Sequence, residues 1–122
     1  MIKAPPYGLY NPLTKTTSIA SSPIGKKDDS DKLRYDLLPP NAIEKIVKIL
    51  TFGAKKYAPD NWKFVNDWKP RYIAALMRHL EAYRKGELID PESGESHLSH
   101  MLCCGIFLLE KEIEESNNHE IN

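Results

Sequence analysis

The hydrophobic positions of the chain fall into three segments with helical spacing, and the residues between them are mostly polar. In residues 41–57 apolar side chains recur every three or four positions, directly after two prolines that mark a helix start. Residues 69–85 repeat the pattern, with Pro70 in the first turn and Gly86 as a stop signal. Residues 96–115 form the third segment. The expected core positions of the third helix are Leu98, Met101, Leu102, Gly105, Leu108, Leu109 and Ile113.

These segments predict an all-α fold, a small helical bundle of three main helices, and none of them predicts a β-strand. The expected core positions of the second helix are Ile73, Leu76, Met77, Leu80 and Tyr83. Residues 1–31 are poor in large apolar side chains and predict an extended or flexible N-terminal arm. Residues 32–115 form the expected helical domain, and residues 116–122 a disordered tail. Because so small a bundle buries a limited core, we expect a homo-oligomer, a dimer or a tetramer, to complete it.

Composition narrows the classes of function. The 122 residues suit one domain, and 17 basic residues cancel 17 acidic ones, which argues against a nucleic-acid-binding protein. No run approaches the roughly 20 apolar residues of a membrane span. The opening stretch, MIKAPPYGLY, lacks the apolar core of a signal peptide, so a cytoplasmic location is expected. Cys103 and Cys104 are neighbours that cannot pair with each other, and they predict small buried side chains in a reducing compartment.

Two histidines and both cysteines lie in one octet, HLSHMLCC, at residues 97–104. His97 and His100 are three residues apart and share one face of the third helix, at the edge of its core stripe. The spacing suits metal binding but supplies only half a site, so further ligands must come from elsewhere. The alternative is that the two histidines cap and pack the start of the helix.

A third histidine and two carboxylates lie nearby in the predicted fold, and the carboxylates are candidates to complete such a site. His79 lies at the margin of the buried face of the second helix, and Asp90 and Glu92 immediately precede the third. Carboxylates in that position are favoured by the helix dipole, which is the structural explanation, but they can also reach His97 and His100. Carboxylate oxygens suit Mg²⁺ or Mn²⁺, and imidazole suits Mn²⁺ or softer ions.

A second cluster follows the first helix. Lys55 and Lys56 can neutralise phosphates, Asn61 can bond a base edge and Trp62 offers a stacking face, with Tyr57 between them. The alternative is an ordinary helix end, where lysines favour the dipole and the tryptophan packs on the core.

Arg78 and Glu81 complete the candidate set on the second helix. On a helical wheel Arg78 turns about 100° away from His79, and Glu81 about 200°. We expect Glu81 to pair with Arg78 or Lys85 on the surface. The alternative is that Arg78 and Glu81 line a pocket formed with another chain.

Four motifs in order carry a family resemblance. They are KYAPDNW (56–62), RYIAALMRHLEAYRKGE (71–87), DPESG (90–94) and HLSHMLCC (97–104). From about Leu33 to Glu110 the chain resembles the phage-type dATP/dGTP diphosphohydrolase N-terminal domain family, which is related to the MazG-type all-α nucleotide pyrophosphohydrolases. The combination of motifs is specific, although no single motif would be.

The resemblance implies a MazG-like nucleotide-binding domain that cleaves a purine (deoxy)nucleoside triphosphate into the monophosphate and pyrophosphate. It implies a divalent metal, Mg²⁺ or Mn²⁺, with Co²⁺ as a further candidate. The implied catalytic residues are His79, Asp90, Glu92, His97 and His100. The implied metal ligands among them are Asp90, Glu92, His97 and His100. The implied substrate-binding residues are Lys55, Lys56, Tyr57, Asn61, Trp62 and Arg78.

The chain departs from the MazG-type pattern at the metal ligands. That group holds magnesium on E-x-x-E and E-x-x-D motifs of two adjacent helices. Here histidines stand in the third helix, and Arg84 follows Glu81 where a second glutamate would stand. Three explanations stay open: a different metal, ligands from the loop at residues 87–96, or a protein of phage origin that binds or sequesters a nucleotide without cleaving it.

Overall fold

The computed structural model describes residues 23–121, and their regular structure is helical apart from one isolated bridge between two loop residues. The three long helices are α1 (Pro40–Lys56), α2 (Trp68–Arg84) and α3 (His97–Ile121). Two short 3-10 helices are η1 (Tyr35–Leu37) and η2 (Asn61–Phe64). The predicted all-α fold with three main helices is therefore confirmed.

The chain divides into two units, and the second begins at Asn41. In the described part of the first unit, residues 23–29 have no regular secondary structure and η1 follows. Arg34 pairs with Asp36 there, with 2.7 Å between Nη2 and Oδ2. The predicted N-terminal arm covers residues 1–31, of which residues 1–22 lie outside the described part of the chain.

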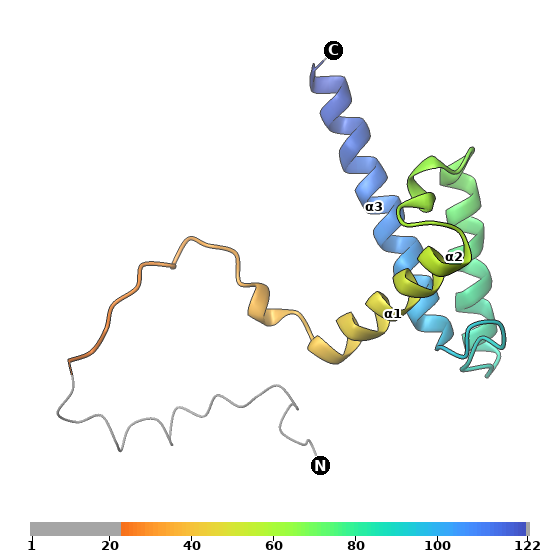
Figure 1. The fold of residues 1–122 in the computed structure, drawn as a ribbon, viewed down its shortest axis with the longest axis horizontal. Coiled ribbons are helices and arrows are strands. Elements are labelled where there is room, and N and C mark those ends of the chain that lie inside the picture. The colour runs from red at the N-terminus through yellow and green to blue at the C-terminus, as the bar shows by residue number, and fades with distance from the viewer. Residues whose placement is uncertain (1–22, 122) are drawn as a thin grey trace. The chain divides into compact units, whose positions relative to one another are not determined.

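In the second unit α2 and α3 pack side by side, and η2 contacts α3 (Figure 1). The buried core centres on Cys103 of α3, which is 2% exposed and packs with Ile46 and Ile49 of α1. Burial raises the pKa of the Cys103 thiol to about 12, so the group stays protonated. Cys103 and Cys104 are both buried and free, as predicted for small apolar side chains.

An aromatic cluster fixes η2 against α3. The ring of Trp62 stacks on Phe107, with centroids 4.5 Å apart and planes 10° apart. Tyr72 of α2 meets the same phenylalanine at 5.3 Å, and its hydroxyl donates a 2.7 Å hydrogen bond to the Trp62 carbonyl. Buried tyrosine hydroxyls need such an acceptor. The three rings therefore connect η2, α2 and α3.

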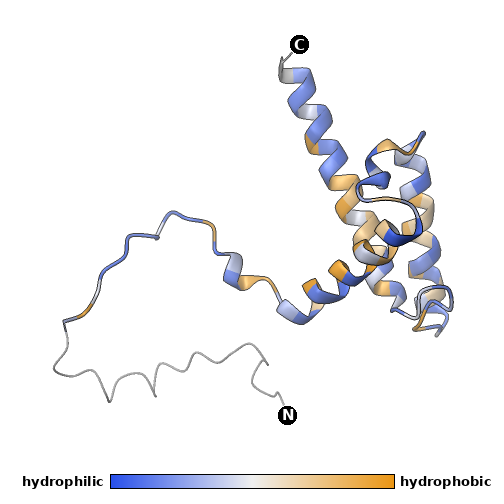
Figure 2. Ribbon diagram, viewed as in Figure 1, coloured by the Kyte–Doolittle hydropathy of each residue, from blue (hydrophilic) through white to orange (hydrophobic). Residues whose placement is uncertain are grey.

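The bounds of α1 and α2 agree with the sequence prediction, but α3 ends later than expected. It continues past Glu115 to Ile121, and its last turns extend beyond the other helices (Figure 1). No glycine or proline follows Gly105, so nothing in the sequence breaks the helix. Apolar residues concentrate in the middle of α3, and its C-terminal part is mostly polar (Figure 2). Among the described residues no helix is both long and apolar enough to cross a membrane.

Several expected core positions are exposed in the single chain, and those predictions are wrong for it. They are Ile73, Met77, Leu80 and Tyr83 on α2, and Leu102, Leu109 and Ile113 on α3. A small bundle covers only one side of each helix, so a stripe on the other side remains open. The buried side of α3 carries Cys103 and Cys104 instead, with Phe107 half-buried.

Candidate metal centre

The candidate site begins where α2 ends. Gly86 has a φ of +104°, which only glycine adopts without strain, and its N–H donates to the Tyr83 carbonyl at 3.0 Å. The N–H of Glu87 donates to the Ala82 carbonyl at 3.0 Å. This pair of hydrogen bonds is a Schellman cap, and it turns the chain sharply out of the helix. The turn places Glu87 at the start of the loop that leads to α3.

The loop then folds back on itself before α3 begins. Ile89 and Ser96 form the isolated bridge, and the Asp90 N–H donates to the Glu95 carbonyl at 2.8 Å. The hydroxyl of Ser96 accepts the N–H of Leu98 at 3.1 Å and caps α3. The closed loop brings Asp90 to the first turn of α3.

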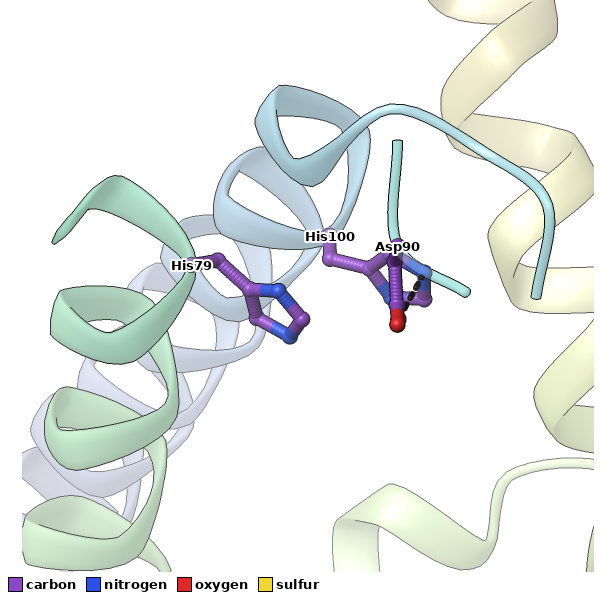
Figure 3. Close-up of side chains that lie close together, drawn as sticks. All are labelled: His79, Asp90 and His100. Atoms are coloured by element: carbon purple, nitrogen blue, oxygen red, sulfur yellow. Dashed lines mark ion pairs between the residues drawn. The ribbon is translucent and has the colours of Figure 1, made fainter. Parts of the chain in front are cut away.

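Three side chains from three segments converge at this point: His79 from α2, Asp90 from the loop and His100 from α3 (Figure 3). Each offers one potential ligand atom, and these atoms lie within 4.8 Å of one another. The rings of His79 and His100 stack with centroids 4.6 Å apart and planes 10° apart. Nε2 of His100 lies 3.2 Å from Oδ2 of Asp90.

Polar contacts hold the aspartate and one histidine in place. The side chains of Asp90 and His100 are only 15% and 14% exposed. Oδ1 of Asp90 accepts the backbone N–H of Glu92 at 3.1 Å, so its other oxygen is left for His100. The Ser93 hydroxyl lies 2.6 Å from Nε2 of the same histidine.

His97 takes a different position from His100. It is 5% exposed, and both of its ring nitrogens have partners. Its Nε2 lies 2.7 Å from Oε1 of Glu87, and its Nδ1 lies 2.9 Å from Nδ1 of His79. The structure thus brings four of the five predicted catalytic residues together, with His97 behind His79. The fifth, Glu92, forms an ion pair with Lys56 of α1.

Burial sets the charge of the two histidines of the cluster. It lowers the pKa of His79, and the neighbouring His100 lowers it further. Burial also lowers the pKa of His100, although the Asp90 carboxylate opposes this. Both imidazoles therefore favour the neutral form, which is the form that binds metal ions.

The donor set fits a divalent transition ion. Two ligands of one ion lie about 3.0–3.4 Å apart when each metal–ligand bond is about 2.1 Å long. The 3.2 Å between His100 Nε2 and Asp90 Oδ2 falls within that range. Two imidazoles with one carboxylate suit Mn²⁺, Co²⁺ or a softer ion better than Mg²⁺, which prefers oxygen ligands.

The predicted substrate-binding residues lie in several places. Lys55 lines an open hollow beside α1, and Tyr57 is exposed at the end of that helix. Asn61 is exposed at the start of η2, and Trp62 packs in the aromatic cluster, which is the structural alternative for this residue. Arg78 is exposed on α2 and makes no ion pair with the described acidic residues.

Glu81 was expected to pair with Arg78 or Lys85, but it pairs with Arg84 instead, at 3.1 Å. Glu87 and Ser93, which contact His97 and His100, are not among the site residues predicted from the sequence. Glu87 and Asp90 have the E-x-x-D spacing in the sequence. Only the cap at Gly86, seen in the structure, shows that the Glu87 carboxylate turns toward α3.

The fold and the site together define an all-α domain with a candidate centre of two histidines and an aspartate. Residues 22–120 match the family model described as dATP/dGTP diphosphohydrolase, N-terminal. The chain belongs to this family.

A named relative is the dATP/dGTP diphosphohydrolase of Salmonella phage PMBT28, which is 30% identical over 76 residues. These residues are 62% of this chain and 26% of the relative, so the chain spans about a quarter of the relative's length. No solved structure matches the chain.

Proposed function

We propose that this protein hydrolyses purine (deoxy)nucleoside triphosphates to the monophosphate and pyrophosphate with the help of a divalent metal ion. The observation that carries the proposal is the convergence of His79, Asp90 and His100 in a chain of this family. The name of the phage relative supports the choice of substrate.

His79, Asp90 and His100 would hold the ion, because each offers one ligand atom to a common point and both imidazoles favour the neutral form. When bound, a divalent ion offsets phosphate charge and lowers the pKa of a water molecule that attacks phosphorus. Asp90 keeps its orientation through the Glu92 N–H. The Ser93 hydroxyl, which contacts Nε2 of His100, would give up this contact when that nitrogen binds the ion. Of the candidate ions, the donor set favours Mn²⁺ or Co²⁺ over Mg²⁺.

A hollow between α1 and the loop supplies space for the nucleotide. Its volume is about 460 Å³, within the range of about 300–1,000 Å³ that small-molecule sites occupy. Lys48 and Lys55 line it and can bind phosphate oxygens, and Phe52 offers an apolar surface. Ser93 lines the hollow and also contacts His100, so the hollow adjoins the histidine cluster.

We further propose that a second copy of the chain covers the exposed side of α3. This side carries the outer stripe, defined as Leu102, Ile106, Leu109 and Ile113, all of them exposed. The spacing of four, three and four residues is that of a helix–helix seam. The chain has no net charge, so two copies do not repel each other strongly.

The test is a measurement of pyrophosphate release from dATP, dGTP, ATP and GTP with Mn²⁺, Co²⁺ or Mg²⁺. We expect release from a purine substrate that depends on added metal and disappears in His100→Ala. The matched control is His119→Ala, because His119 is an exposed histidine near the end of the same helix.

Two outcomes contradict the proposal in different ways. If no nucleotide is cleaved but one raises the melting temperature, the protein is a nucleotide-binding module without turnover. If no nucleotide is cleaved and none raises the melting temperature, the nucleotide assignment itself is wrong.

A further inference from the structure

The contacts behind the metal candidate determine which nitrogen of His79 carries a hydrogen. Oε1 of Glu87 lies 2.7 Å from Nε2 of His97, and an ionised carboxylate can only accept a hydrogen bond. Nε2 of His97 must therefore carry its hydrogen and donate it. A neutral His97 then has its lone pair on Nδ1.

The same reasoning extends to the next contact. Nδ1 of His97 lies 2.9 Å from Nδ1 of His79, and one of these nitrogens must donate. Because the lone pair of His97 occupies its own Nδ1, the donor is Nδ1–H of His79. A neutral His79 then has its lone pair on Nε2. This is the tautomer that an imidazole side chain adopts less readily in water, so the protein has to select it.

We infer that Glu87 and His97 form a positioning pair that holds His79 as the Nδ1–H tautomer, so that Nε2 is the ring nitrogen whose lone pair remains for the cluster with Asp90 and His100. This inference rests on the proposed metal role of His79 and adds the residues that prepare it. It also gives His97 a role other than metal ligand, since both of its nitrogens are already bonded. Metal-binding histidines commonly donate their second N–H to a fixed acceptor, which orients the ring.

The two members of the positioning pair differ in burial. His97 is 5% exposed, whereas the side chain of Glu87 is 57% exposed. Glu87 can therefore be replaced without opening a cavity. The Schellman cap that places Glu87 is made by backbone atoms, so it is retained in a variant at this position.

The first test reads the tautomer directly in the full chain without metal or nucleotide. Long-range ¹H–¹⁵N spectra of histidine-labelled protein at pH 8.5 distinguish Nδ1–H from Nε2–H for each ring. We expect Nδ1–H for His79 and Nε2–H for His97. In Glu87→Ala the preference of His79 should weaken, and in Glu87→Gln it should persist because the amide oxygen can still accept from His97. Nε2–H on His79 of the unmodified protein would overturn the inference.

The second test measures the affinity for Co²⁺ by calorimetry, in the absence of nucleotide. Loss of an outer partner of a metal ligand typically costs 10–100-fold in affinity, and we expect a loss of about this size in Glu87→Ala and a smaller one in Glu87→Gln. The control is Glu81→Ala, which removes an exposed α2 carboxylate that pairs only with Arg84. Equal Co²⁺ affinity of Glu87→Ala and the unmodified protein would reject the positioning role. If His79 shows the expected tautomer but Co²⁺ does not bind at all, the proposed metal function fails and the tautomer assignment stands.

Discussion

The two sides of α3 both depart from the usual distribution of side chains: the inner side buries polar groups in its first turns, and the outer side exposes a stripe of apolar ones. One side is buried and carries His97, which is 5% exposed, together with His100. The opposite side is exposed and carries the outer stripe, where Leu109 is 57% exposed. Burying polar groups costs free energy unless each is hydrogen-bonded, and exposing a run of leucine and isoleucine gains nothing for a single chain. This difference supports both proposals, metal chemistry on the inner side and a second copy of the chain on the outer one.

The largest effect is expected when a candidate metal ligand is removed from the inner side of α3. We expect Asp90→Ala, His79→Ala and His100→Ala each to weaken Co²⁺ binding and pyrophosphate release by at least about 100-fold, since loss of an outer partner alone costs up to that much. Calorimetry measures Co²⁺ binding, and a pyrophosphate assay measures the release.

The matched control for these variants is again His119→Ala, with unchanged circular dichroism as the check on folding. His100→Gln serves if the alanine variant does not fold, because it keeps polar atoms beside Ser93 and Asp90. If activity survives in all three alanine variants, the catalytic metal centre does not lie on the inner side.

A charged side chain on the outer side should weaken the proposed association of two copies. Leu109→Asp places a carboxylate in the middle of the outer stripe, and we expect it to weaken association of two copies by about 2 kcal/mol, or roughly 30-fold in Kd. Light scattering during size-exclusion chromatography measures the change in mass. Phe64→Asp is the control, because Phe64 is 80% exposed on η2 and lies outside the stripe. A monomeric unmodified protein would show that no second copy covers this side.

The sequence was sufficient to predict the helices and insufficient to predict which of their faces are covered. Helical spacing and the stop at Gly86 gave α1 and α2 nearly their observed bounds. The same spacing placed Leu102 and Leu109 in the core, because periodicity identifies an apolar face but not the neighbour that buries it. The cysteines, read as small apolar residues, do lie in that core.

The candidate site was predictable in its residue types but not in its connections. Asp90 and His100 are among the metal ligands that the resemblance implies, and the structure brings them together with His79, which was expected as a catalytic residue and not as a ligand. The other two implied ligands, Glu92 and His97, lie outside this cluster. His100 contacts Asp90 whereas His97 contacts Glu87, and this difference depends on the path of the loop. A glycine with positive φ and a single bridge determine that path. Such a path leaves no periodic signal in the sequence.

The pKa directions give a pH test of the inner side. Burial lowers the pKa of His79 and His100 below the ordinary value of 6.5, so below that pH the unfolded chain binds more protons than the folded one. Stability should therefore be complete above pH 6.5 and fall as the pH drops below it. Melting curves of the metal-free protein between pH 8 and pH 5 measure this.

The comparison for that test is the double variant His79→Gln/His100→Gln, whose melting temperature should depend less on pH over the same range. A melting temperature that rises on acidification in the unmodified protein would contradict the assignment of neutral imidazoles. It would indicate that carboxylates such as Asp90 stabilise the protonated rings more than burial penalises them.

The smallest expected effect separates Glu92 from Asp90, two carboxylates of one loop that the sequence treats alike. Glu92 pairs with Lys56 on an exposed surface, where solvent screens the interaction, whereas Asp90 is nearly buried against His100. We expect Glu92→Ala to leave Co²⁺ affinity within about twofold and to change the melting temperature little, as Lys56→Ala should do. If Glu92→Ala instead lowers Co²⁺ affinity as much as Asp90→Ala, the loop rearranges on metal binding and brings Glu92 to the ion, as the family resemblance implies. The inner site would then have a fourth ligand, and the ion pair with Lys56 would belong to the metal-free protein alone.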